Sequence, residues 1–243
     1  MKSTHIVSSF NADMEKIETL IIDMSKHVQQ QLSDATKALA EEDRKLAKKV
    51  LRGDDKINKL EAELNDMALK ILALRQPVAI DLRIVIMSLK MARHLERCGD
   101  YAKNMARRTR TITKAEAFTG SVGTLVRMSD MVQDMIQKML KAYKQRDIAL
   151  ADEVRADDEH VDQMHNTMFR ELLTYMMEDS RNVSGAIHLL LMAKNLERVG
   201  DHVADVAREI TYMVTGEWPL NKRSKDDHTS KMIIDPTSDE AFD

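Results

Sequence analysis

The sequence predicts an all-α fold of two tandem three-helix bundles related by internal duplication, with six long antiparallel helices. Composition favours helices: the 243 residues include 18 methionines but only 7 glycines and 3 prolines, so residues that disrupt helices are rare. No segment shows the alternation of apolar and polar residues that is typical of strands. The duplication is visible as a nine-residue phrase, residues 95–103, that returns at residues 196–204 with five of its nine residues identical. A repeat with so long a period fixes the architecture.

Three helices are expected in the first half, because apolar residues recur there every three or four positions. The first helix covers about residues 9–40. Asp43 is expected to cap the second helix, which runs to about Leu74. Pro77 separates the second helix from the third, since the residue before a proline is pushed out of helical geometry. The third helix carries the first copy of the phrase and fades near residue 115.

The second half shows the same order of elements. A break at residues 118–121 precedes a fourth helix over about residues 124–146, and Asp147 is expected to cap the fifth. Residues 179–182 form the next joint, and the sixth helix covers about residues 183–215 with the second copy of the phrase. Helices of about 30 residues are roughly 45 Å long, and long helices with short joints form up-and-down bundles.

The repeat divides the chain into three parts. Residues 1–117 form the first three-helix unit, and residues 118–220 form the second. Residues 221–243 are polar and lack periodicity, so a flexible C-terminal tail is expected there.

Charge and cysteine content argue against several classes of protein. The net charge is −3, with 40 acidic and 37 basic residues, and the basic residues form no patch of the kind that nucleic-acid binding requires. The single Cys98 allows neither an intrachain disulfide nor a cysteine-rich zinc site, and we expect it to pack as a small apolar residue. No apolar run reaches the roughly 20 residues of a membrane span, and the first residues lack the features of a secretory signal. We therefore expect a cytoplasmic protein.

Each copy of the phrase begins a row of oxygen-bearing side chains that lie on one helix face. The positions i, i+4 and i+8 hold Glu96, Asp100 and Asn104 in the first copy, and Glu197, Asp201 and Asp205 in the second. The second and fifth helices carry matching rows at i, i+4 and i+7, formed by Asp54, Asn58 and Glu61, and by Asp158, Asp162 and His165. Neighbouring carboxylates repel one another, and a bound cation relieves that repulsion. This donor set suits Mg, Mn, Fe or Zn.

A purely structural interpretation of the rows stays open beside the metal hypothesis. Acidic residues four positions apart are common on solvated helix faces, and neighbouring arginines would pair with them only weakly. The glycine in each phrase, Gly99 or Gly200, would also explain the repeat if it lets two helices approach closely. His94 and His202 lie beside the rows, and histidines in such places are expected at the surface more often than as ligands.

The two phrases, Glu96-Arg97-Cys98-Gly99-Asp100 and Glu197-Arg198-Val199-Gly200-Asp201, resemble the duplicated Glu-x-x-x-Asp signature of the PhoU family. Three further stretches, residues 29–35, 75–83 and 173–181, also resemble that family and occur in the expected order. The resemblance covers about residues 10–216. Cys98 and Val199 stand where the family usually has isoleucine, which is a small change in packing.

The resemblance implies a fold, a role and a set of partners. PhoU proteins are two three-helix bundles packed side by side, usually as homodimers, and they are adaptors and not enzymes. They keep the phosphate-starvation regulon silent when phosphate is plentiful, by linking the phosphate ABC transporter and its ATPase subunit to a phosphate-sensing histidine kinase. Some members carry iron or zinc clusters on the acidic rows, and others carry magnesium or manganese. Carried over by position, the metal candidates are Glu96, Asp100, Glu197 and Asp201.

Two functions from other classes remain as alternatives. A carboxylate metalloenzyme of the di-iron type would be a helical bundle, but such bundles need Glu-x-x-His on two helices, and no histidine here has a glutamate three residues before it. A phosphotransfer bundle would use an exposed histidine such as His94. In the second copy that position is Asn195, and the acidic rows have no role in this scheme.

Overall fold

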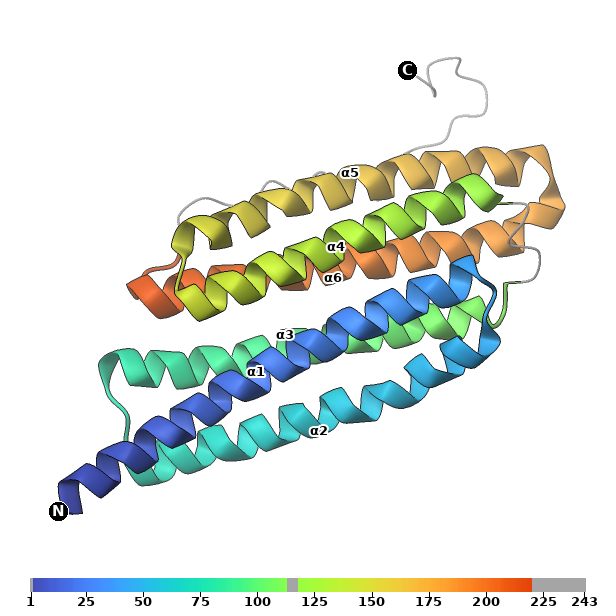
Figure 1. Ribbon diagram of the computed structural model, residues 1–243. Coiled ribbons are helices and arrows are strands. Elements are labelled where there is room, and N and C mark those ends of the chain that lie inside the picture. Colours follow the sequence, from blue (N-terminus) through green and yellow to red (C-terminus); the bar gives the residue numbers. More distant parts are fainter. Residues whose placement is uncertain (1, 113–117, 220–243) are drawn as a thin grey trace.

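The protein, seen here in a computed structural model, is all-helical, as the sequence predicts. The structure describes residues 2–112 and 118–219, and the predicted tail at residues 221–243 lies outside them. Within these ranges the chain forms six α-helices and one short 3-10 helix, shown in Figure 1. Their bounds are α1 Lys2–Ala40, α2 Arg44–Arg75, α3 Ala79–Thr109, α4 Thr119–Gln145, α5 Ile148–Glu178, η2 Ser180–Asn182 and α6 Val183–Thr215. No helix of this part of the chain combines the length and the hydrophobicity needed to cross a membrane.

The predicted helix caps are confirmed. The carboxylate of Asp43 accepts hydrogen bonds from the backbone N–H groups of Lys45 and Leu46, at 2.8 and 3.0 Å. Asp147 accepts one from Leu150 at 3.0 Å and so begins α5. Each cap satisfies backbone donors that have no partner within the helix.

Three helix ends differ from the prediction. Helix α1 begins at Lys2, seven residues before the predicted start, and α3 ends at Thr109 instead of near residue 115. The predicted break at residues 118–121 is wrong, because α4 already begins at Thr119. A contact with α5 accompanies this early start: the buried Ser121 hydroxyl donates to Glu171 Oε1 at 2.8 Å. A tertiary contact of this kind overrides the weak helix propensity of glycine and serine.

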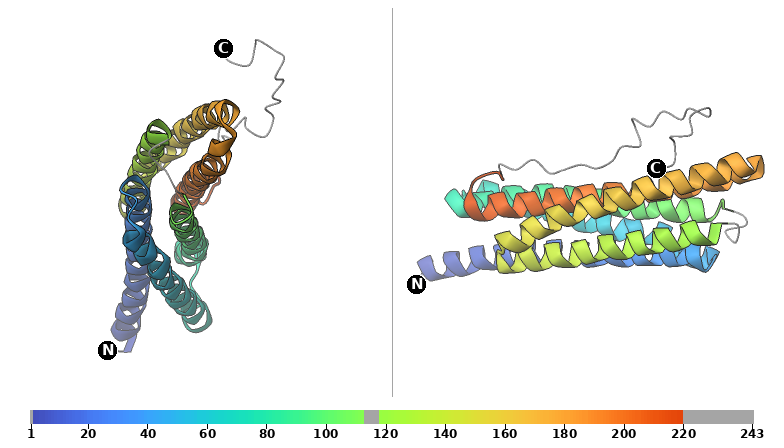
Figure 2. Two further views of the ribbon diagram at one scale, coloured as in Figure 1. Left: turned by 90° about the vertical axis from the view of Figure 1, so that its right-hand side faces the viewer. Right: turned by 90° about the horizontal axis from the view of Figure 1, so that it is seen from above.

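The two halves pack side by side and share one core. Helix α2 packs on α1 and α3, α5 packs on α4 and α6, and the halves meet where α3 contacts α6 and α1 contacts α4. Figure 2 shows the six helices running along one another in an elongated body. The apolar face predicted for α1 is buried, and one cluster of buried side chains extends through both halves. Cys98 lies in this cluster, as predicted.

The glycines of the repeated phrase lie where neighbouring helices approach closely. A Cβ atom on Gly99 would stand 2.8 Å from Ile57 Cδ1 of α2, and one on Gly200 would stand 2.6 Å from Asp158 Oδ1 of α5. Both distances are shorter than van der Waals contact. The structural interpretation of the repeated glycine is therefore confirmed. In the second half, the close approach at Gly200 brings α6 next to Asp158 of α5.

We expect Gly200→Ala to lower the free energy of unfolding by about 1 to 2 kcal/mol, since the new methyl group collides with a buried, short carboxylate side chain. This net value already includes the gain of about 1 kcal/mol in helix propensity, which offsets part of the loss from the collision. Urea denaturation followed by circular dichroism measures the change. The matched control is Gly123→Ala, where the nearest atom to the new methyl group is 3.7 Å away and only the propensity gain remains. Equal effects at the two positions would contradict the packing argument.

Candidate metal centres between the helices

The first acidic row is interleaved with arginines. Nη1 of Arg93 lies 3.7 Å from Glu61 Oε1 of α2 and 3.0 Å from Glu96 Oε2 of α3. Arg97 lies 3.5 Å from Asp100. Burial raises the pKa of the Glu96 carboxyl, and the negative charge of Asp100 raises it further. The predicted residues of α2 and α3 do face each other, but guanidinium groups balance much of their charge.

A lysine neutralises the most deeply buried carboxylate of the first half, that of Asp54. Asp54 is only 1% exposed, and its carboxylate accepts hydrogen bonds from Lys103 Nζ and, at 3.4 Å, from Asn58 Nδ2. Asn104 turns its oxygen to Arg107, at 3.4 Å. Sequence reasoning missed Lys103, although it is the last residue of the repeated phrase and differs from its counterpart in the second copy.

The second half buries its acidic residues more deeply. Asp158, Asp162 and His165 of α5 are 0%, 1% and 2% exposed, and Glu197 of α6 is 3% exposed. Lys194 Nζ lies 3.0 Å from Glu197 Oε1, whereas Oε2 has no hydrogen-bond partner among the described residues. Burial raises the pKa of Glu197, and the charges of Asp201 and Asp162 raise it further. The two predicted rows of this half therefore converge between α5 and α6.

The donor set of the second half fits a divalent cation better than that of the first. The position of Lys103 is taken by Ala204, which is 2% exposed, so this half lacks the lysine that neutralises Asp54. Its two rows offer five carboxylates and one imidazole, whereas those of the first half offer four carboxylates and two amides. Buried carboxylates that lie together are costly unless a cation compensates them. The buried Oε2 of Glu197 is such a donor atom.

Asp205, the last residue of the row on α6, lies beside two histidines. Among the described residues, His94, His202 and Asp205 form the group whose potential ligand atoms all lie within 4.8 Å of one another. Both histidines are half-buried, and their Nδ1 atoms are 2.9 Å apart. The side chain of His94 is 22% exposed, so it is less accessible than the exposed histidine that a phosphotransfer bundle would use. Asp205 lies 3.7 Å from Arg208 as well.

Sequence reasoning missed this histidine group, but a signal for part of it was present. His202, Asp205 and Glu209 stand at i, i+3 and i+7, so they share one face of α6. The contribution of His94 could not be predicted, because it comes from a helix 108 residues earlier in the chain.

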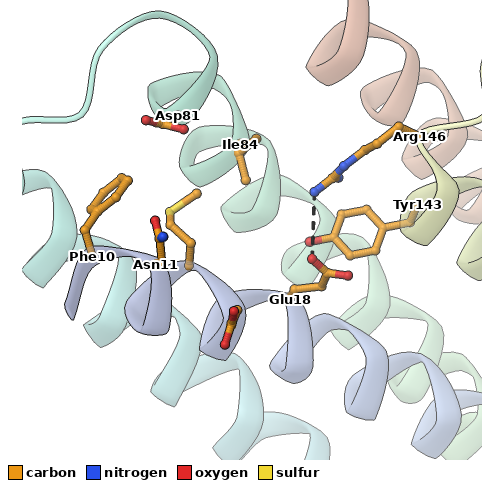
Figure 3. A pocket seen from close by; sticks show the side chains of 9 residues that line it. Phe10, Asn11, Glu18, Asp81, Ile84, Tyr143 and Arg146 are labelled. Atoms are coloured by element: carbon orange, nitrogen blue, oxygen red, sulfur yellow. Dashed lines mark ion pairs between the residues drawn. The ribbon is translucent and has the colours of Figure 1, made fainter. Parts of the chain in front are cut away.

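A separate hollow of about 270 Å³ lies between α1, α3 and α4 (Figure 3). At one side Arg146 forms an ion pair with Glu18, at 3.9 Å, and stacks over the ring of Tyr143 with its guanidinium carbon 5.0 Å from the ring centre. Burial raises the pKa of the Tyr143 hydroxyl. None of the predicted site residues lines this hollow, which belongs to the junction between the two halves.

Comparison with known proteins supports the family resemblance. The model of the PhoU domain family matches residues 21–109 and 125–210. The phosphate-specific transport system accessory protein PhoU homologue of Caulobacter vibrioides is 38% identical over 227 residues, covering 93% of this chain and 99% of the relative. The homologue of Rhizobium meliloti is 36% identical over 232 residues, covering 96% and 98%. The crystal structure of PhoU from Pseudomonas aeruginosa superposes with a TM-score of 0.81 at 36% identity, covering 86% of this chain and all of that one.

Proposed function

Since this chain belongs to the PhoU family, we propose that it is a cytoplasmic adaptor that silences the phosphate-starvation regulon and modulates phosphate uptake. Its partners in this role are the ATPase subunit of the phosphate ABC transporter and a phosphate-sensing histidine kinase, and its working form is a homodimer. The observation that carries the proposal is the match of both halves to the PhoU domain, together with relatives named as accessory proteins of phosphate-specific transport. That family is regulatory and not enzymatic, so the di-iron alternative is set aside.

The acidic residues between α5 and α6 support a metal-binding role within this function. The site would be formed by Asp158, Asp162, His165, Glu197 and Asp201. The first four of these side chains are almost fully buried, and the charge of Asp201 acts on the carboxyl of Glu197 and raises its pKa. A bound divalent cation would neutralise these carboxylates and tie α5 to α6. The chain's own residues hold the donors in place: Gly200 lets α6 approach Asp158, and Lys194 fixes one oxygen of Glu197.

Apolar side chains at one end of the molecule support a docking role. Leu74 and Val78, at the joint between α2 and α3, are 69% and 73% exposed, and Ile80 and Leu82 at the start of α3 are 50% and 40% exposed. We call these four residues the joint patch. Clustered exposed apolar residues often mark contacts with other proteins. In Figure 1 the joint between α2 and α3 lies at the opposite end of the body from the end of α5.

Complementation in cells tests the proposed function. Deletion of the gene should raise expression from a starvation-controlled promoter during growth in excess phosphate, and the parent gene should restore silence. Val78→Ser combined with Ile80→Ser should fail to restore it, since truncating central interface residues lowers affinity by roughly tenfold or more. The matched control, Met177→Ser with Ile187→Ser, removes two exposed apolar side chains at the other end of the body.

Three results would contradict parts of the proposal. An unchanged promoter after deletion would overturn the regulatory role. Failure of both double variants to silence the promoter, at equal protein levels, would remove the joint patch as the specific contact. Absence of the transporter ATPase and of the kinase from material that co-purifies with the parent from phosphate-replete cells would overturn the proposed partners.

A further inference from the structure

A group of metal-ligand side chains joins the two halves of the molecule, away from the contacts between α2 and α3 and between α5 and α6. His94 comes from α3 in the first half, and His202 and Asp205 come from α6 in the second. Their potential ligand atoms lie within 4.8 Å of one another, and the two Nδ1 atoms are 2.9 Å apart. Donors that converge from two packed helices are held in place by the core beneath them.

A buried carboxylate points into this group from one turn further along α6. Glu209 is only 4% exposed. Its Oε1 lies 3.5 Å from Nε2 of His94, and its Oε2 has no hydrogen-bond partner among the described residues. A carboxylate at Nε2 favours the tautomer with its proton there, which leaves a lone pair on Nδ1 toward His202. Metal-binding histidines usually donate their second ring N–H to such a carboxylate.

The second imidazole is also fixed in orientation. The ring of Tyr101 stacks on His202, with ring centres 5.7 Å apart and planes inclined by 20°. The guanidinium of Arg198 in turn lies over the ring of Tyr101, with its carbon 5.9 Å from the ring centre. The ring of His202 is therefore held against α3 while its Nδ1 faces His94.

We propose that His94, His202 and Asp205 bind one divalent transition-metal ion, with zinc as the best match, and that Glu209 positions His94 for it. Two imidazole nitrogens and a carboxylate oxygen are a common ligand set for zinc and leave a fourth position open. In tetrahedral zinc sites the ligand atoms are about 3.3 Å apart. Binding would open the 2.9 Å contact between the imidazoles and draw in the carboxylate of Asp205, which lies within 4.8 Å of both. The ion would link α3 to α6 and so join the two halves.

Zinc binding by metal-stripped protein tests this site. Titration calorimetry and elemental analysis after dialysis should show one zinc equivalent fewer for His94→Gln with His202→Gln than for the parent. The control, His27→Gln with His160→Gln, removes two imidazoles that lie outside the group and should retain the full amount. A third variant, Glu197→Gln with Asp162→Asn, alters only the donors between α5 and α6, so it should keep the zinc bound by the histidines.

Glu209→Gln keeps the three ligands and tests the positioning residue. It should lower the zinc affinity of this site about 10- to 100-fold without removing it, as replacement of such second partners does elsewhere. This variant also decides the matter if the double histidine variant fails to fold by circular dichroism. Equal zinc content in the parent and the histidine variant would overturn the site in favour of a proton shared between the two imidazoles. An unchanged zinc affinity in Glu209→Gln would overturn the positioning role of Glu209.

Discussion

Lys103→Met is expected to lower the free energy of unfolding by about 3 kcal/mol, because it leaves the Asp54 carboxylate buried without its cation. Asp54 is 1% exposed, and its other neighbour, Asn58, donates a single long hydrogen bond of 3.4 Å. Urea denaturation followed by circular dichroism measures the loss.

A second substitution separates the buried charge from the lost packing. Lys103→Met with Asp54→Leu should recover most of the stability, since replacing both members of a buried ion pair by apolar residues is often neutral. The matched control is Lys138→Met, which breaks a 2.7 Å ion pair with Asp157 that is partly solvated and should cost at most about 1 kcal/mol. A double variant as unstable as the single one would contradict the argument.

Glu197→Gln with Asp162→Asn is expected to lower the affinity of the second half for divalent cations at least tenfold, because ligand charge sets the strength of such sites. In metal-free protein the same change should cost little stability, because the repulsion that it removes between buried carboxylates offsets the lost ion pair between Glu197 and Lys194. Calorimetric titration with manganese and denaturation in the presence of a chelator measure the two effects. A large loss of metal affinity with little change in stability distinguishes a metal site from a structural ion pair.

The first half provides the comparison. Glu96→Gln with Asp100→Asn should have a smaller effect on metal affinity, because Arg93 and Arg97 already balance those carboxylates. Ala204→Lys places a lysine where the first half has Lys103, so it should weaken metal binding between α5 and α6 without touching a ligand. Unchanged metal affinity in Ala204→Lys, with the protein folded, would show that the missing lysine is not what distinguishes the two halves.

The acidic phrases show how far residue types alone predict a site. The spacing of Glu96 and Asp100, and of Glu197 and Asp201, places each pair on one helix face, and this follows from the 3.6-residue period of the α-helix. The spacing does not reveal how deeply each pair is buried. The side chain of Glu197 is 4% exposed, whereas that of its counterpart Glu96 is 12% exposed. Burial depends on how neighbouring helices cover the face, which the residues of one helix do not specify.

The sequence by itself determined the all-α class, the duplication, most helix ends and the family, because helix periodicity, capping residues and repeated phrases are local properties. Only the tertiary structure decided which charges meet. Lys103 reaches Asp54 across 49 residues, and His94 meets His202 across 108. The early start of α4 likewise accompanies the contact of Ser121 with Glu171. Such contacts depend on how the helices pack, and the energy of a charge depends on the burial that this packing creates.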